Sequence, residues 1–351
     1  MGITKKLLTI VAVALLGILG LALPAQAHEL PAGFHPSGRG WCLDFKLPVA
    51  PAEGAARTWR VAATLCQPFH WAEGRREVDV LTHGATYTRT YWDWPQQPDF
   101  YSYVGKTLAA GRATLNYDRI GNGASTRPAS STEITMATDA HVLHQLINIV
   151  KLLGFRHINS ISHSYGSGVA LAEAAKYQDV STVVLTGYLH RPSNPAVTAG
   201  NYPANQDPKF QGLGLDGGWL TTRPGVRGFG FHSPTSDPDV VAFDEEQKDI
   251  VSRTGLLDFL GQRNTPAATN VSNQVTVPVF VVNGQLDAIF CLDPATFDCA
   301  NEPAVAGNEA PFYEGSSAFV VRTIPGSGHD LTLHPSANTS FEIINQWLMS
   351  N

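Results

Sequence analysis

The junction at Ser164 constrains the fold more than any other part of the chain. Residues 158–163 have the composition of a buried strand, and residues 165–172 have that of the helix that follows. A serine between two such elements sits on a sharp, strained turn with its hydroxyl exposed. The segment S-H-S-Y-G at 162–166 matches the G-x-S-x-G pattern of this turn, with serine in place of the first glycine. The sequence therefore predicts a strand, a turn and a helix here, with a candidate nucleophile at the turn.

The rest of the chain alternates apolar β-patterns with helical patterns. This alternation predicts an α/β fold with a mostly parallel sheet and helices on both faces. The expected strands are residues 78–82, 113–117, 158–163, 180–185, 277–283 and 319–324. The expected helices are residues 101–110, 133–153, 166–177 and 340–349. Between about residues 191 and 275 the alternation stops, and a Gly-, Pro- and Asn-rich stretch precedes one helical pattern at 240–259. We therefore expect a core in two parts, residues 28–190 and 276–351, separated by an insertion.

The first 27 residues have the layout of a secretory signal peptide. Lys5 and Lys6 precede an uncharged stretch at residues 7–23, and the A-x-A sequence of residues 25–27 follows. We predict cleavage after Ala27 and a secreted protein with no membrane span. An uncleaved anchor is the alternative, because the apolar stretch is at the short limit for a spanning helix. The formal net charge of -6 offers no basic field for nucleic acid.

Export predicts disulfide bonds between the cysteines. The chain has four, Cys42, Cys66, Cys291 and Cys299, which allow three pairings. Two expected strands at residues 41–47 and 58–66 fold back at Gly54, so an N-terminal hairpin would place Cys42 opposite Cys66. The other two cysteines then close a short loop. Free thiols or metal ligands are the alternatives, but the chain has neither C-x-x-C nor a Cys/His cluster.

Two further residues complete a predicted catalytic triad. A serine hydroxyl needs a base to take its proton, and the base needs a third group to fix its tautomer. Asp287 follows the expected strand at 277–283, and His329 follows the one at 319–324 through a Gly-Ser-Gly turn. We predict Ser164 as nucleophile, His329 as base and Asp287 as the orienting acid. The alternative is that Ser164 is only a small residue at a turn.

Other side chains compete for two of these roles. His334 lies five residues after the predicted base, and Asp293 and Asp298 lie beyond the predicted acid. Both aspartates are farther from the end of the strand and belong to the predicted loop between the last two cysteines. The position of His329 directly after a strand and a tight turn favours it over His334.

Backbone donors for a developing oxyanion are also expected. The residue after the nucleophile, Tyr165, supplies one amide. His83-Gly84 at the end of the strand at 78–82 lets the backbone turn inward, so the amide of Ala85 is the second. A metal-ligand role for His83 is set aside, because the chain has no second ligand at metal spacing and no H-E-x-x-H.

These segments together resemble the α/β-hydrolase superfamily. The resemblance rests on residues 83–85, 118–125, 162–166, Asp287 and Gly328-His329, and it covers essentially the whole chain after residue 27. It implies the α/β-hydrolase fold, with the insertion at 191–275 as a cap. It also implies a serine esterase, lipase, lactonase or related hydrolase, for which we expect neither cofactor nor metal.

Aromatic residues after the predicted oxyanion strand suggest a substrate pocket. Tyr87, Trp92 and Trp94 belong to a cluster of seven aromatics at residues 87–103, and Trp219 lies in the expected cap. We predict that these four line an apolar acyl or alcohol pocket. Ordinary packing of a loop against a helix is the alternative.

The predicted function is cleavage of carboxylic esters of fairly apolar substrates through an acyl-enzyme. The expected partner is a small-molecule or lipid-like ester. A capped peptidase or amidase of the same fold is the first alternative, with the acidic residues of 237–246 as a site for a substrate amine. A non-catalytic binding protein on a hydrolase scaffold is the second.

Overall fold

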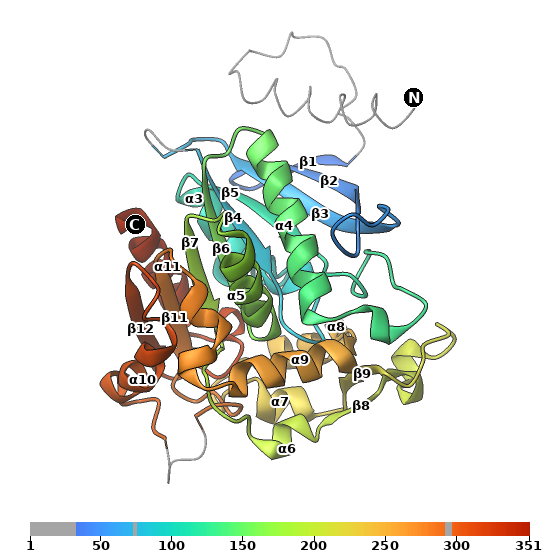
Figure 1. Cartoon of the computed structure of the whole chain (residues 1–351). Helices are drawn as coiled ribbons and strands as arrows, with labels where there is room; N and C mark the ends of the chain where they lie inside the picture. Colours follow the sequence, from blue (N-terminus) through green and yellow to red (C-terminus); the bar gives the residue numbers. More distant parts are fainter. Residues whose placement is uncertain (1–32, 73–75, 292–296) are drawn as a thin grey trace, which may run out of the picture.

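A nine-stranded sheet forms the centre of the described part of the molecule (Figure 1). The computed structural model describes residues 33–72, 76–291 and 297–351. The strand order is β1-β2-β3-β5-β4-β6-β7-β11-β12. The bounds are β1 (Phe34–Ser37), β2 (Gly40–Val49), β3 (Trp59–Pro68), β4 (Glu77–Thr82), β5 (Ala113–Tyr117), β6 (His157–His163), β7 (Thr182–Thr186), β11 (Val279–Gly284) and β12 (Phe319–Ile324). Pairing is antiparallel from β1 to β5 and parallel from β5 to β12. The predicted mostly parallel sheet is confirmed.

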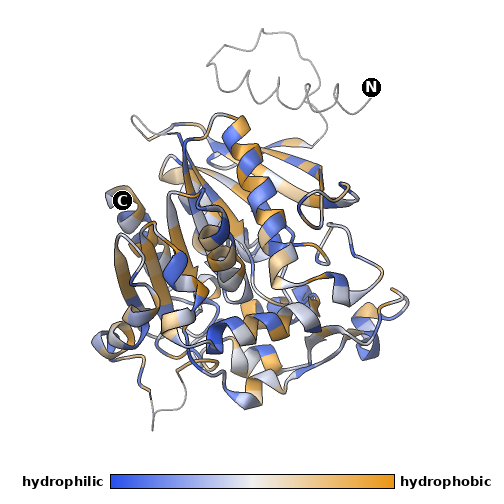
Figure 2. Ribbon diagram, in the orientation of Figure 1, coloured by the Kyte–Doolittle hydropathy of each residue, from blue (hydrophilic) through white to orange (hydrophobic). Residues whose placement is uncertain are grey.

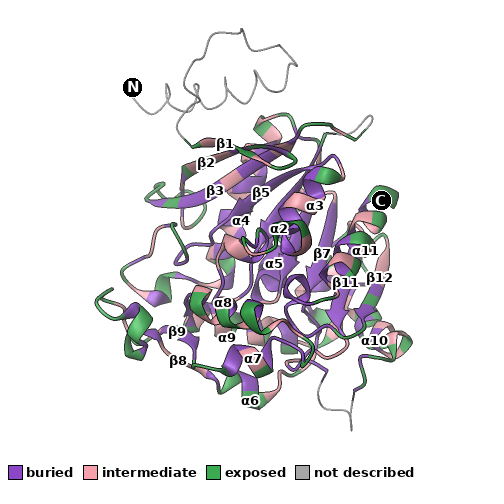
Figure 3. Cartoon of the chain, turned by 180° about the vertical axis from the view of Figure 1, so that it is seen from behind, coloured by how far each residue is buried: buried purple, intermediate pink, exposed green. Residues whose placement is uncertain are grey.

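Helices cover both faces of this sheet. Figure 1 shows α4 and α5 in front of the strands, and Figure 3, from behind, shows α3 and α11 on the other side. The bounds are α2 (Pro98–Tyr101), α3 (Tyr103–Ala109), α4 (Met136–Leu152), α5 (Tyr165–Tyr177), α10 (Glu302–Glu309) and α11 (Ala337–Ser350). Every residue of β4, β5, β7 and β11 is buried, as strands covered on both faces require (Figure 3). Figure 2 shows that much of these central strands is coloured as apolar.

The inserted segment forms a second, smaller sheet with its own helices. They lie together at one end of the main sheet in Figure 1. The bounds are α6 (Pro195–Thr198), β8 (Asn201–Pro203), β9 (Trp219–Thr222), α7 (Val226–Gly230), α8 (Pro238–Gln247), β10 (Val251–Ser252) and α9 (Arg253–Asn264), and the strand order is β10-β9-β8. We call residues 191–275 the cap segment.

The single cap helix predicted at 240–259 is wrong. The structure divides it into α8 and α9, with an extended stretch between them. Asp249 in this stretch donates its amide to Thr86 O at 2.8 Å and accepts from the amide of Gly123 at 2.7 Å. Contacts with two loops of the main domain thus replace the helical hydrogen bonds that the local pattern predicted.

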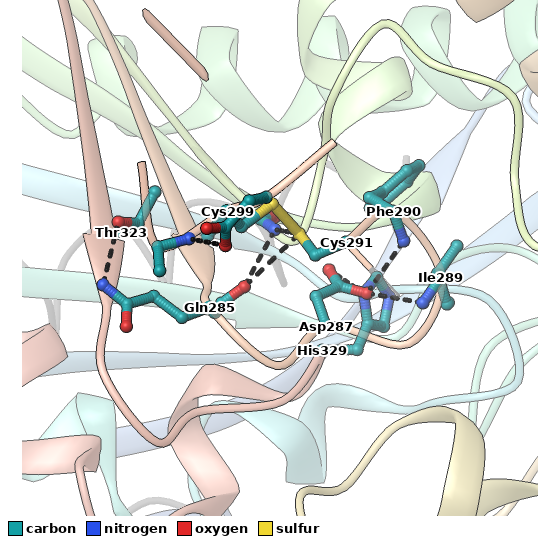
Figure 4. Close-up of a disulfide and its surroundings, with 12 residues drawn as sticks. Gln285, Asp287, Ile289, Phe290, Cys291, Cys299, Thr323 and His329 are labelled. Atoms are coloured by element: carbon teal, nitrogen blue, oxygen red, sulfur yellow. Dashed lines mark hydrogen bonds and ion pairs between the residues drawn. A yellow bond between two sulfur atoms is a disulfide. The ribbon is translucent and has the colours of Figure 1, made fainter. Parts of the chain in front are cut away.

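The structure contains the two disulfides that the sequence predicts. Cys42 on β2 lies directly opposite Cys66 on β3 in the sheet register and is bonded to it. Cys291 is bonded to Cys299 and closes the loop after Asp287 (Figure 4). The first bond ties down the N-terminal strands, and the second closes a shorter segment.

Within the described ranges, no helix combines the length and the apolar character needed to cross a bilayer. The predicted signal peptide lies outside the described residues.

Removing the two disulfides separately should have unequal effects on stability. The chain-entropy relation gives about 3.5 kcal/mol for a loop of the size closed by Cys42–Cys66 and about 2.6 kcal/mol for that of Cys291–Cys299. We expect the double serine variant of the first pair to lower the free energy of unfolding more than that of the second. Urea unfolding of both variants under non-reducing conditions measures the difference. A larger loss for the second pair would contradict this account.

Candidate active site

The nucleophile candidate lies between β6 and α5, as the strand-turn-helix motif predicts. Ser164 has φ 52° and ψ -118°, a left-handed backbone conformation that is strained for any residue with a side chain. Its amide donates to Thr186 O on the neighbouring strand at 2.8 Å. A Cβ at Gly166 would lie 2.5 Å from Thr82 O, so only glycine allows the first turn of α5 to approach β4 this closely. The turn is therefore held by its two neighbouring strands.

Asp287 and His329 form a hydrogen-bonded pair at the ends of adjacent parallel strands. His329 Nδ1 lies 2.9 Å from Asp287 Oδ2 (Figure 4). The other carboxylate oxygen of Asp287 accepts the amides of Ile289 at 2.8 Å and Phe290 at 3.3 Å. Both members of the pair are buried. The carboxylate thus has partners at both oxygens, which fixes its orientation toward the imidazole.

The buried carboxylate also sets the protonation of the histidine. Burial lowers the pKa of His329, but the charge of Asp287 and its hydrogen bond raise it more, so the pKa lies above its ordinary value. With Nδ1 turned to Asp287, Nε2 is the ring atom left to exchange a proton at the cavity.

Ser164 and His329 line the same cavity, of about 250 Å³. The hydrogen bonds of the described residues include none between these two side chains; in free enzymes such a contact often closes only with substrate. Ala85 and Tyr165, the predicted oxyanion donors, line the cavity as well. Tyr165 is the first residue of α5, so its amide has no acceptor within the helix. The roles of all four residues stay predictions at this point.

The competing residues have other contacts. His334 Nδ1 donates to Asp330 O at 2.6 Å, and its Nε2 accepts the amides of Gly328 at 3.0 Å and Ser233 at 2.9 Å. Both ring nitrogens are thus used by the backbone, and burial lowers the pKa of His334 to about 4. Asp298 is exposed and accepts from the amide of Ala300. Asp293 lies outside the described residues.

A network of buried polar side chains, which the sequence does not predict, lies beside the predicted triad residues. Asp330 accepts from Tyr87 Oη and lies 3.2 Å from His163 Nε2, and Tyr87 Oη also contacts Asp244 of the cap segment. His232 joins them, with Nε2 3.1 Å from Asp244. The only signal in the sequence is that His163 and Asp330 adjoin two candidate catalytic residues. Which partners they take depends on segments far away in the chain.

Arg227 links this network to the predicted oxyanion loop. Its guanidinium binds both oxygens of Asp244 at 2.8 Å each and donates to Thr86 Oγ1 at 3.0 Å. Thr86 is a β-branched residue at φ 59°, a conformation that needs such support. It directly follows Ala85, so a residue of the cap segment helps to hold the backbone that carries one predicted oxyanion donor.

Only one of the four predicted pocket aromatics lines the cavity. Tyr87 lies in its wall. The structure places the others in side-chain packing elsewhere: Trp92 against the ring of Tyr103, Trp94 against Phe243, and Trp219 against Gly121. Apolar residues of the cap segment supply much of the wall instead, namely Val197, Tyr202, Leu220, Phe231, Leu256 and Phe259.

His83, considered as a metal ligand from the sequence, uses both ring nitrogens in backbone contacts. Nδ1 donates to Gly84 O at 2.9 Å, and Nε2 accepts the amide of Arg119 at 3.0 Å. In the described part of the chain, three groups have ligand atoms close enough to share one ion: His163, His329 and Asp330; His144, Glu173 and Asp179; and His232, Asp244 and Asp330. Lys151 and Arg227 already pair with carboxylates of the second and third groups.

A family model described as "Alpha/beta hydrolase family" matches residues 80–339. No curated protein matches the sequence. Many solved structures do match the fold.

Three of these structures illustrate the likeness. A thermophilic esterase from Thermogutta terrifontis is 21% identical, with a TM-score of 0.58 over 88% of this chain and 98% of that one. A soluble variant of monoglyceride lipase from Saccharomyces cerevisiae is 18% identical, with a TM-score of 0.58 over 83% of this chain and 92% of the lipase. An esterase from Exiguobacterium antarcticum is 17% identical, with a TM-score of 0.56 over 86% and 97% of the two chains. At these identities the likeness shows the shared fold.

The buried pair between Arg227 and Asp244 yields a stability prediction. Arg227→Met leaves the buried Asp244 without its counter-charge, which should cost about 3–5 kcal/mol of unfolding free energy. Replacing both residues, as Arg227→Met with Asp244→Leu, should cost less than the single change because no unpaired charge remains. Urea unfolding of the single and double variants measures this coupling. Equal or greater loss in the double variant would refute the account.

Proposed function

Since the chain belongs to the alpha/beta hydrolase family, we propose that it is a secreted serine hydrolase that cleaves carboxylic esters of small, fairly apolar substrates. The observation that carries the proposal is that Ser164, His329, Ala85 and Tyr165 line one cavity, with Asp287 hydrogen-bonded to His329 behind it. The two disulfides fit an exported protein.

In the proposed mechanism Ser164 Oγ attacks the ester carbonyl while His329 Nε2 takes its proton. Asp287 holds the Nδ1 proton and stabilises the imidazolium that forms. The amides of Ala85 and Tyr165 donate to the oxyanion of the tetrahedral intermediate. Collapse breaks the bond to the alcohol oxygen, which receives the proton from His329. A water molecule, deprotonated by His329, then hydrolyses the acyl-enzyme and frees Ser164.

The nature of the cavity favours esters over substrates with a free amine. No Asp or Glu is among its lining residues in the described part of the chain. Asp237 accepts from the amide of Asp239 at the start of α8, Asp244 pairs with Arg227, and Glu245 pairs with Lys248. These three acidic groups of the cap segment are engaged, and neither they nor Asp239 and Glu246 line the cavity, which argues against the aminopeptidase alternative. The similarity in fold to esterases and a monoglyceride lipase points the same way.

The proposal predicts that Ser164 is the sole nucleophile. Ser164→Ala should abolish labelling by a fluorophosphonate probe and lower turnover of nitrophenyl esters by about 10⁴-fold or more, because the acyl-enzyme no longer forms. The melting temperature should not fall, since alanine removes only the hydroxyl. Persistent labelling of the variant would rule out this assignment.

A second prediction concerns the acid and the pH profile. Only neutral His329 accepts a proton, and Asp287 raises its pKa, so kcat/KM should fall as the pH drops through a pKa above the ordinary histidine value. Asp287→Asn removes the raising charge and favours the wrong tautomer. We expect kcat to drop by about 10³- to 10⁴-fold and the acid limb to move to lower pH.

His334→Ala is the matched control, because His334 is equally buried but bonds only to the backbone. It should reduce kcat far less than His329→Ala and leave the position of the acid limb unchanged. Equal losses in the two histidine variants, or an unmoved limb in Asp287→Asn, would count against the assignment.

A further inference from the structure

Arg263 differs from the other deeply buried arginines of the described residues. Its side chain lies on α9 and is 1% exposed. Arg112, Arg119 and Arg227 are equally buried, and each pairs with an aspartate at 2.8 to 3.0 Å. Arg263 has no carboxylate partner in the described ranges: Nη2 donates to Ser193 Oγ at 2.6 Å, while Nε and Nη1 have no partner. A buried guanidinium with unused donors is energetically costly unless an anion completes it.

Arg263 is one of the residues that line the cavity with Ser164 and His329. The rings of Phe259 and Phe290 lie 5.2 and 4.9 Å from its guanidinium. Phe259 in turn packs on Tyr165 next to the nucleophile, with 5.6 Å between ring centres, and Phe290 lies 5.9 Å from His329. Arg263 therefore lies beside two aromatic rings, one of which packs next to the nucleophile candidate and the other next to the predicted base.

No carboxylate of the described residues forms a direct pair with this charge. Burial lowers the pKa of Arg263 to about 10, although the charges of Tyr188, Asp287 and Glu309 partly oppose the effect. Such a pKa still leaves it positive at neutral pH. Asp287 already binds His329, and Glu309 binds His190 at 2.8 Å. The positive charge of Arg263 is thus left for a group that enters the cavity.

We propose that Arg263 binds a carboxylate of the substrate, so that the ester cleaved at Ser164 also carries a free carboxylate. This inference rests on the proposed function. A carboxylate is favoured over a phosphate because it carries a single charge, which one guanidinium balances, whereas a phosphate would leave excess negative charge in a largely apolar cavity. The small cavity, of about 250 Å³, favours a short substrate. The substrate class is either a monoester of a short dicarboxylic acid or an ester of a short hydroxy acid.

Two pairs of esters test this and distinguish the two sources of the carboxylate. Nitrophenyl hydrogen succinate carries it on the acyl side, and acetoxyacetate carries it on the alcohol side. The neutral amides of similar shape, nitrophenyl succinamate and acetoxyacetamide, are their controls. We expect the wild-type enzyme to prefer the acid over the amide in one pair. Arg263→Met should lower kcat/KM for that acid by about 10- to 100-fold, mainly through KM, and change the matching amide by less than about threefold.

Two further variants separate binding from a structural role. Arg263→Lys keeps the charge but not the planar donor edge, so it should retain part of the preference. Arg223→Met is the matched control, because it removes the same charge from the cap segment. Arg223 is exposed, stacks on Tyr202 and does not line the cavity. This variant should leave the preference intact. If Arg263→Met lowers activity on acid and amide alike, together with the melting temperature, the residue is structural and the inference is overturned.

The outcomes distinguish this inference from the proposed function. If the wild-type enzyme hydrolyses the ester bonds of both neutral controls as efficiently as those of the matching acids, the inference is overturned and the proposed function stands. Failure to cleave any ester overturns the function. In that case calorimetry with succinate on the Ser164→Ala protein still decides: binding that is lost on adding Arg263→Met supports the carboxylate site. Absence of binding, or binding of inorganic phosphate in its place, overturns it.

Discussion

The turn at Ser164 is the constraint on which the rest of the structure depends. β6 must pass into α5 through a single residue with a left-handed backbone, and this strained geometry persists only if the neighbouring elements enforce it. The amide of Ser164 is held by Thr186 of β7, and Gly166 allows α5 to approach the end of β4. The parallel pairing of these three strands therefore determines where the nucleophile candidate points. His329, paired with Asp287, lines the same cavity as Ser164 because β11 and β12 continue the same parallel sheet.

Three buried histidines near this turn show how local partners set different properties in one environment. Burial lowers the pKa of His163 and of His334, but Asp287 raises that of His329 above its ordinary value. His334 gives both ring nitrogens to the backbone, and His163 contacts Asp330 and Thr186. Burial alone therefore does not identify a base. His329, the predicted base, differs from the other two in the carboxylate at its Nδ1 and in an Nε2 for which the described residues show no hydrogen bond.

The cap segment contributes charge as well as apolar wall to the cavity. Arg227 forms an ion pair with Asp244 inside the protein and donates a further hydrogen bond to the strained Thr86. This arginine therefore stabilises the backbone beside the predicted oxyanion donor. Arg263, on the next helix but one, is equally buried and has no carboxylate. Two buried arginines thus have different roles: Asp244 pairs with the guanidinium of Arg227, whereas the unpaired guanidinium of Arg263 can bind a ligand. This contrast makes a charged substrate compatible with a largely apolar cavity.

The sequence by itself determined the features that depend on short segments and their order. The turn at Ser164, the parallel strands around it and the register of Cys42 with Cys66 follow from local patterns that the structure repeats. Tertiary contacts decided the rest. The helix predicted at 240–259 is broken where Asp249 forms hydrogen bonds with loops of the main domain. The stabilisation from these long-range hydrogen bonds cannot be predicted from the local sequence pattern. Trp92 and Trp94 pack away from the cavity, whereas Arg263 lines it. Among the neighbours of these side chains are residues from segments far away in the sequence, so only the tertiary structure determines them.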